Sequence, residues 1–297
     1  MPDRLLLGAH LSTGKGLVAM LHTAVALECT CAQIFTSSPQ QWRGKARTGA
    51  EADAFKAAQT ATGVTPVIAH ENYLINLASL DAEILGKSQR AFREEIARCG
   101  MLGLPMLVMH WGSHKGGTLE EGIARLAEGL KEMIPLADAA GVQIVLEATA
   151  GQGTYTAGQG TYMGGDLAQF PQLFAQIPAH DRLGVCLDTA HLFAAGYDLR
   201  DEAFYRAFWE TFDRHLERDR LKVIHMNDTE KALGSHVDRH AHIGQGQLGV
   251  DAFRRIMQDP RLAAVPKILE TPDGEAMHAE NLRVLRALAG TAPSSPG

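Results

Sequence analysis

Residue types that bind metal ions recur at the ends of seven of eight short apolar segments. The segments, rich in β-branched residues, lie at 5–10, 31–36, 65–70, 105–110, 142–147, 183–188, 221–226 and 266–271. The second segment ends at Thr36, whereas the other seven end on, or one residue after, His10, His70, His110, Glu147, Asp188, His225 and Glu270. A single histidine there is usually structural, but many carboxylates and imidazoles buried together without cations would cost several kcal/mol per uncompensated charge. The set therefore indicates bound metal ions.

Two further pairs extend this set. The spacing of Asp188 and His191 places both side chains on one side of a helical turn, and that of Asp238 and His240 places both on one side of an extended segment. Histidine, aspartate and glutamate without thiolates suit Zn²⁺ or Mn²⁺ in open catalytic sites. A catalytic ion takes three or four protein ligands, so the set predicts a cluster of two or three ions.

A cluster of metal ions favours phosphoryl chemistry. Ions a few ångströms apart can hold an attacking hydroxide on one side of phosphorus and neutralise the departing oxygen on the other. The predicted reaction is therefore the hydrolysis of a phosphoester.

The elements that must position these groups follow from the pattern between the segments. Near-continuous apolarity is typical of strands buried on both faces, and the intervening stretches show helical periodicity. Eight strand–helix units of even length predict a (β/α)₈ TIM barrel, in which the C-terminal strand ends converge on one face. A doubly wound open sheet is the alternative, but no G-x-G-x-x-G follows the first strand.

Length and composition predict one soluble domain. The 297 residues fit a single barrel, which we place at 1–289, followed by a flexible tail at 290–297. No apolar run reaches bilayer length and no secretory cleavage pattern follows the first segment, so we expect a cytoplasmic protein that does not enter a membrane. The four cysteines show no C-x-x-C spacing and are expected to be reduced core thiols.

The formal net charge of −6 argues at first against a nucleic-acid partner. Three divalent ions would add about +6 and make the active face locally positive, which removes the objection. A duplicated glycine-rich stretch at 150–162 is expected to be a mobile loop, and His22, His180, His215 and His278 are expected at the surface.

A known family shares many short motifs with this chain in the same order. They are GAHLS (8–12), QW (41–42), HENYLINL (70–77), HWGSH (110–114), LEATAGQG (146–153), CLDTAH (186–191), AAGYD (194–198), HMND (225–228), VDRH (237–240), IGQG (243–246) and ILET (268–271). On these motifs, which span nearly the whole chain, the sequence resembles bacterial endonuclease IV, the abasic-site endonuclease.

The resemblance implies three divalent ions, with Zn²⁺ expected and Mn²⁺ an alternative at one or more sites. Its ligand sets are His70, His110 and Glu147 for the first ion, Glu147, Asp188, His225 and Glu270 for the second, and His191, Asp238 and His240 for the third. It also implies that Glu147 bridges two ions, that a hydroxide attacks the phosphate 5′ to an abasic sugar, and that the third ion stabilises the departing 3′ oxygen. Glu147 and Glu270 are the predicted catalytic residues, with Glu270 orienting or deprotonating the attacking water.

The resemblance further implies a monomer that binds double-stranded DNA at abasic sites, bends it and flips the abasic nucleotide out. Tyr73 matches the wedge residue, and Gln40 and Trp42 lie in a second recognition loop, where Gln40 replaces a common arginine. His10 and His114 are expected behind the ligands or against phosphate. Ala148 stands where family members commonly carry Asn, and Trp111 where they commonly carry Pro. These differences concern the residues that support the metal ligands, not the ligands themselves.

Two other functions compete with this prediction. A sugar isomerase or epimerase also uses a barrel with histidine and carboxylate ligands, but it needs only one or two ions, so the Asp238–His240 pair argues against it. The other is a catalytically idle protein that binds damaged DNA and recruits partners, against which the intact ligand set argues.

Overall fold

Eight parallel strands form a closed barrel in the computed structural model, which describes residues 4–153 and 161–290. Around the barrel the strands follow the order β1–β10–β7–β6–β5–β4–β3–β2. Their bounds are β1 (Leu7–His10), β2 (Cys31–Phe35), β3 (Val67–His70), β4 (Met106–Met109), β5 (Gln143–Glu147), β6 (Leu183–Asp188), β7 (Leu221–His225) and β10 (Lys267–Leu269). Each strand lies inside one of the eight predicted segments, and the predicted TIM barrel is confirmed.

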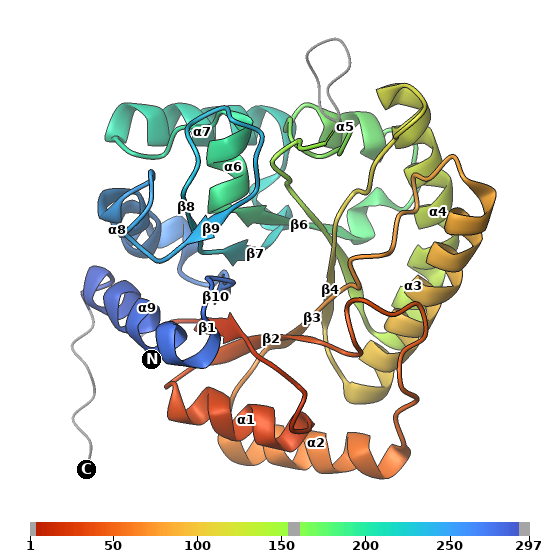
Figure 1. The fold of residues 1–297 in the computed structure, drawn as a ribbon, viewed down its shortest axis with the longest axis horizontal. Helices are drawn as coiled ribbons and strands as arrows, with labels where there is room; N and C mark the ends of the chain where they lie inside the picture. Colours follow the sequence, from red (N-terminus) through yellow and green to blue (C-terminus); the bar gives the residue numbers. More distant parts are fainter. Residues whose placement is uncertain (1–3, 154–160, 291–297) are drawn as a thin grey trace.

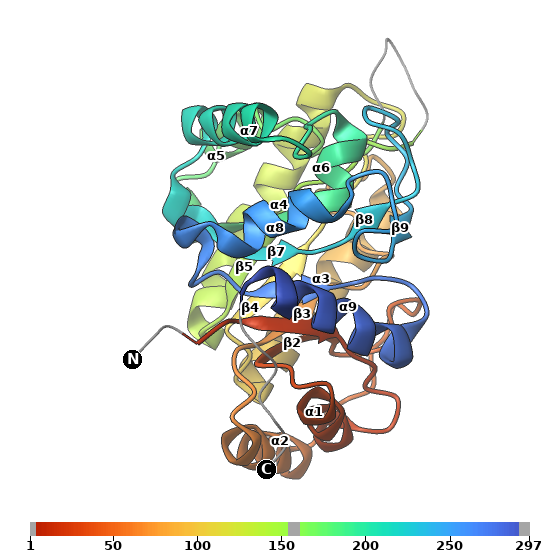
Figure 2. The same cartoon turned by 90° about the vertical axis from the view of Figure 1, so that its left-hand side faces the viewer.

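Helices surround the strands on the outside of the barrel (Figures 1 and 2). They are α1 (Leu17–Ala26), α2 (Gly49–Thr62), α3 (Ala82–Leu102), α4 (Leu119–Ala140), α5 (Gln169–Phe174), α6 (Thr189–Ala195), α7 (Glu202–His215), α8 (Val250–Gln258) and α9 (Gly274–Leu288). A threonine N-cap precedes both α2 and α4. Its side chain accepts a hydrogen bond from the backbone amide of the third helical residue, a glutamate whose side chain accepts one from the backbone amide of the threonine. Such capping boxes satisfy amide groups that the first helical turn leaves unpaired.

The inside of the barrel is built in layers because alternate residues of a strand point to the same face. One layer is an apolar cluster with a residue from seven of the strands: Cys31, Ile68, Val108, Val145, Cys186, Val223 and Ile268. Two residues after each of these, on the same face, stand Gln33, His70, His110, Glu147, Asp188, His225 and Glu270. In the first strand Gly8 and His10 hold the corresponding positions, and a Cβ on Gly8 would lie 1.9 Å from the Cys31 carbonyl oxygen. The next layer, toward the C-terminal ends of the strands, is therefore polar.

The loop between β7 and β10 carries structure that the sequence pattern did not predict. A short antiparallel hairpin, β8 (Asp228–Thr229) with β9 (His240–Ala241), precedes α8. Its turn carries Asp238, and His240 opens the returning strand. The hairpin thereby brings this pair over the barrel mouth, although the pair does not lie at the end of a barrel strand.

Two smaller predictions have different outcomes. The prediction of a surface position is wrong for His278, which is 4% exposed because it lies on the inward stripe of α9 with Asn281 and Leu282. All four cysteines are buried and free, as predicted. The central part of the duplicated loop at 150–162 and nearly all of the predicted tail lie outside the described residues, and the domain boundary at 289 stays a prediction.

Within residues 4–153 and 161–290, no helix is both long enough and apolar enough to cross a membrane.

Candidate metal centre

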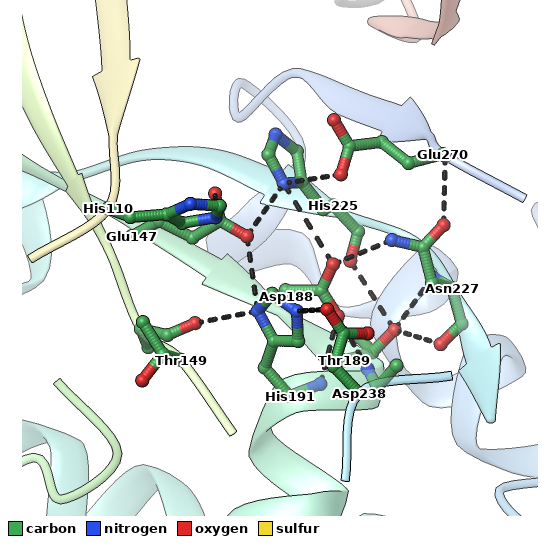
Figure 3. Close-up of polar contacts among 12 residues, drawn as sticks. His110, Glu147, Thr149, Asp188, Thr189, His191, His225, Asn227, Asp238 and Glu270 are labelled. Carbon is green, nitrogen blue, oxygen red and sulfur yellow. Dashed lines mark hydrogen bonds and ion pairs between the residues drawn. The ribbon is translucent and has the colours of Figure 1, made fainter. Parts of the chain in front are cut away.

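Side chains from the strand ends and from the β8–β9 hairpin converge at the C-terminal mouth of the barrel (Figure 3). Four groups among the described residues each offer ligand atoms that lie within 4.8 Å of one another; one of them, Glu147–Cys186–His225, includes a thiol, and the other three consist of histidines and carboxylates. These three are His70–His110–Glu147, Glu147–Asp188–His225–Glu270 and Asp188–His191–His240. Glu147 belongs to the first two groups and Asp188 to the last two, so the three groups form one continuous cluster.

Glu147 is the centre of the cluster and is fully buried. Its Oε2 lies 3.2 Å from His70 Nε2 and 3.3 Å from His110 Nε2. Its Oε1 lies 3.2 Å from His225 Nδ1 and 3.2 Å from His191 Nδ1. The two oxygens thus face different histidines, which is the arrangement that a bridging carboxylate requires.

The second group lies around His225. Its Nδ1 faces Glu270 Oε2 at 3.3 Å and Asp188 Oδ2 at 3.9 Å, in addition to Glu147. Asp188 is also the N-cap of α6, because its Oδ1 accepts from the backbone amides of Ala190 and His191. The cap leaves Oδ2 to point into the cluster.

The third group is completed by Asp238 from the β8–β9 hairpin. Its Oδ2 lies 3.2 Å from His191 Nε2, and its Oδ1 lies 3.2 Å from His240 Nε2. His240 Nε2 also lies 3.6 Å from Asp188 Oδ2. The two pairs with short sequence spacing, Asp188–His191 and Asp238–His240, therefore meet at one point.

These contacts fit metal coordination better than hydrogen bonding. With zinc bonds of about 2.0–2.1 Å, neighbouring ligands in a tetrahedron stand about 3.3–3.4 Å apart, close to the distances above. The Nε2 atoms of His191 and His240 are buried and form no hydrogen bond with any described residue, although Asp238 lies 3.2 Å from each. Buried polar atoms rarely lack a partner, so this geometry is typical of ligands around a cation.

The outer nitrogens of the histidines support the same interpretation. Nδ1 of His70 donates to the Glu71 carbonyl oxygen at 2.9 Å, and Nδ1 of His240 donates to the Glu270 carbonyl oxygen at 3.0 Å. Nε2 of His225 donates to Gln33 Oε1 at 2.9 Å. Because these acceptors hold the ring proton on the outer nitrogen, the inner nitrogen keeps a lone pair directed at the cluster. Nitrogen lone pairs and carboxylate oxygens that face each other favour a positive charge between them.

The pKa shifts of the clustered residues also indicate a site that attracts positive charge. Burial raises the pKa of Glu147, but the neighbouring His225 and His110 outweigh it and hold the pKa well below its usual range. Burial lowers the pKa of His240, yet Asp188 and Asp238 raise it to about 9. The carboxylates therefore create a strongly negative potential where the imidazole nitrogens meet, and this potential favours any positive charge placed there.

Two amides hold the carboxylates in place, and sequence reasoning missed both. Gln33 Nε2 donates to Glu270 Oε1 at 2.6 Å, and Asn227 Nδ2 donates to Asp188 Oδ2 at 2.6 Å. Counting alternate residues back from Phe35 would have revealed Gln33 on the inner face. Thr36, the end of the predicted segment, instead bonds to Glu95 outside the cluster.

His10 and His114 have different environments. His10 Nδ1 lies 3.0 Å from Glu270 Oε1, directly behind a candidate ligand. His114 Nδ1 donates to the Gly117 carbonyl oxygen at 3.0 Å, within the loop that precedes α4. The structure thus places His10, but not His114, in contact with the cluster.

The three residues predicted to bind DNA lie on loops beside the cluster. The Tyr73 ring packs edge-on against Phe35, but the residue is 58% exposed. This exposure excludes an ordinary core position for Tyr73. Trp42 is half-buried, and Gln40 is exposed. Tyr73 and Trp42 line a cavity of about 700 Å³ whose walls also include His110, Asp238 and His240.

The chain matches a family described as "Xylose isomerase-like TIM barrel" over residues 21–288. It is 43% identical over 283 residues to "Probable endonuclease 4" of Chloroflexus aurantiacus, covering 95% of this chain and 97% of that protein. "Probable endonuclease 4" of Geotalea daltonii is 43% identical over 285 residues, covering 94% and 96%. The crystal structure of endonuclease IV from Thermus thermophilus superposes with a TM-score of 0.82 at 36% identity, covering 96% and 99%.

Fold and site together define an enzyme of the xylose isomerase-like TIM-barrel class with clustered candidate metal ligands. Within that class the chain belongs to the endonuclease IV family and is an endonuclease. The crystal structure of 3-keto-D-glucoside 4-epimerase from E. coli, with a TM-score of 0.67 at 14% identity, shares the fold alone.

Proposed function

We propose that the protein is a metal-dependent abasic-site endonuclease of base excision repair. It hydrolyses the DNA phosphodiester 5′ to an abasic site and leaves a 3′-hydroxyl and a 5′-deoxyribose phosphate. The observation that carries the proposal is the continuity of the three ligand groups through Glu147 and Asp188. Such a cluster can hold three divalent ions around one phosphate, and Zn²⁺ suits its nitrogen and oxygen ligands.

The ligand sets follow the contacts described above. His70, His110 and Glu147 would hold one ion; Glu147, Asp188, His225 and Glu270 a second; and His191, Asp238 and His240 a third. When bound, such ions polarise a phosphate, lower the pKa of a nearby water and neutralise a departing oxygen. The remaining tasks fall to the side chains of this chain.

Glu270 is suited to orient the attacking water and to take its proton. Glu147 and Asp188 are fully buried, whereas the Glu270 side chain is 18% exposed and can be reached from the mouth of the barrel. His10 and Gln33 both hold its Oε1, which directs Oε2 toward the cluster. Oε2, the oxygen that would bind the second ion, would also lie beside a water held by that ion and can accept a hydrogen bond from it.

The surroundings of the cluster suit a nucleic-acid strand. On one side, the cavity of about 700 Å³ carries the aromatic rings of Trp42 and Tyr73 together with Arg239. Another cavity of about 830 Å³ includes His10 and the cations Lys15, Lys45 and Arg47. Aromatic rings stack on unpaired bases and cations attract phosphates, so the two cavities suit a strand that passes over the ions. This arrangement supports a double-stranded DNA substrate with a flipped abasic nucleotide.

The test is incision of a duplex that carries one abasic analogue. The purified protein, assayed with its metal content measured on the same sample, should cut 5′ to the lesion and hold close to three metal ions. A chelated sample serves as the control and should lose the activity. Incision should yield a 3′-hydroxyl that a DNA polymerase can extend.

Two outcomes would contradict the proposal. Three bound ions without incision would show that this chain, with Gln40 and Ala148 at their positions, does not cut abasic DNA. One bound ion without incision would favour a sugar epimerase, because proton transfer on a small polyol has no task for the Asp238–His240 group.

Tyr73→Ala is predicted to weaken binding to an abasic duplex more than binding to an undamaged duplex. Loss of one base-stacking aromatic costs about 1–3 kcal/mol, so the dissociation constant for the abasic duplex should rise about 5- to 150-fold. Binding is measured by fluorescence anisotropy in a Glu270→Gln background so that the duplex stays intact. Phe204→Ala, which removes an exposed aromatic from the outer helix α7, is the matched control. Equal losses on both duplexes would reduce Tyr73 to a structural role.

A further inference from the structure

A buried ion pair on α3 lies beneath the β2–α2 loop, residues 36–48, which carries Gln40 and Trp42. Arg98 and Glu95 are 8% and 2% exposed, and their closest atoms are 3.1 Å apart. Thr36 Oγ1 donates to Glu95 Oε2 and accepts from Arg98 Nε at 2.9 Å. The ion pair therefore bonds directly to the first residue of the loop.

The rest of the β2–α2 loop packs around the Arg98 guanidinium. Arg47 Nη2 donates to the Thr36 carbonyl oxygen at 3.0 Å, which joins the two ends of the loop. Arg98 Nη2 donates to Ser37 Oγ at 3.4 Å. A Cβ on Gly44 would lie 2.7 Å from both Arg98 Nη1 and Ser37 Cβ, so the loop backbone passes directly over the guanidinium and a side chain at Gly44 would push it and Ser37 away. Arg98 thus fills the inside of the loop.

The tip of the β2–α2 loop is joined to the loop that carries Tyr73. The Asn72 side-chain amide donates to the carbonyl oxygens of Gln41 and of Ser38, the latter at 3.4 Å. The Tyr73 backbone amide donates to the Pro39 carbonyl oxygen at 3.2 Å. The position of the Tyr73 main chain therefore depends on the β2–α2 loop.

We propose that Arg98, paired with Glu95, is a positioning residue for lesion recognition, because it holds the β2–α2 loop and the Tyr73 loop as one unit. The proposal rests on the proposed function. Arginine is suited to this task because its planar guanidinium presents five donors in a fixed geometry, whereas lysine would present a single point charge. A buried ion pair is also costly to break, so the unit has one preferred arrangement. Neither residue bonds to a candidate metal ligand; among the described residues their contacts run to the β2–α2 loop and along α3.

The test uses two variants that disturb this contact from opposite sides, Arg98→Lys and Gly44→Ala. Gly44→Ala keeps the ion pair, so it remains informative should Arg98→Lys fail to fold. Arg93→Lys is the matched control on α3, where Arg93 forms an exposed ion pair with Glu132. Gly49→Ala is the matched control for the glycine, because a Cβ there meets nothing within 4 Å.

Hydrogen–deuterium exchange of the metal-loaded protein should show faster exchange at both 37–48 and 72–75 in the two variants and in neither control. The ratio of the dissociation constants for undamaged and abasic duplex should fall about 3- to 30-fold. Metal content and kcat at saturating abasic duplex should stay within about twofold of the wild type, because an interaction that only aids binding leaves kcat unchanged.

Faster exchange at 37–48 with unchanged exchange at 72–75 would overturn the coupling of the two loops. Faster exchange in both loops with an unchanged ratio of dissociation constants would overturn the role of the two loops in lesion recognition. If the wild type neither cuts nor prefers the abasic duplex, the proposed function fails, and the exchange data still decide whether Arg98 anchors both loops.

Discussion

Glu270→Gln should lower the cleavage of an abasic duplex by about 10²–10⁴ while folding and most of the metal content stay intact. The expected loss is that of a general base, because glutamine cannot take a proton from the attacking water. An amide can still accept hydrogen bonds through its oxygen, so the contacts from His10 and Gln33 to this position survive in part. The ions held by the other ligands should therefore remain.

Single-turnover cleavage with excess enzyme measures this effect without interference from product release. Glu275→Gln is the matched control, because Glu275 is an exposed glutamate in the first turn of α9. Metal content by mass spectrometry and a thermal unfolding curve should match the wild type for both variants. Near-normal cleavage by Glu270→Gln would remove Glu270 from the mechanism.

Asp238→Asn should release about one of the three expected metal ions and lower cleavage at least about a hundredfold. Asp238 faces both His191 and His240 at 3.2 Å, so it adds a second negative charge, beside Asp188, to the third group. Loss of a single transition-state charge stabiliser commonly costs about 10²–10³ in rate. The fold should tolerate the change, because Asp238 lies on a surface hairpin and its side chain is partly exposed.

Metal stoichiometry and cleavage are measured on the same preparation. Asp251→Asn, on α8 where Asp251 pairs with Arg254, is the control for loss of one surface carboxylate. Unchanged stoichiometry together with normal cleavage would show that Asp238 holds no ion that the reaction needs. A fall in stoichiometry with normal cleavage would leave a two-ion mechanism and would weaken the distinction from an epimerase.

The sequence predicted the barrel and its strands closely because the relevant forces are local. A strand buried on both faces must be apolar along its length, and this requirement leaves a mark that can be read without its neighbours. The eight apolar segments therefore contain the eight barrel strands. The candidate ligands were predicted for a similar reason, because a fold without bound cations would rarely place histidines and carboxylates at so many strand ends.

The residues that the sequence did not reveal act through partners distant in the chain. Gln33 touches Glu270, which is 237 residues away, and Arg98 touches Thr36, which is 62 residues away. Strand periodicity can place a glutamine such as Gln33 on the inner face, but the group that it bonds to is known only from the fold. The error at His278 is of another kind. This residue was predicted at the surface, although its helical spacing to Asn281 and Leu282 places it on the inward stripe of α9.

The sequence by itself determined which residue types end the strands and, through helical and strand periodicity, that a barrel brings them to one face. Only the tertiary structure decided which oxygen of Glu147 faces which histidine and how the β8–β9 hairpin carries Asp238 to His191. Strand patterns depend on the burial of each segment, which is encoded locally. Side-chain pairing depends on barrel closure, which joins residues through space, and no local pattern records it.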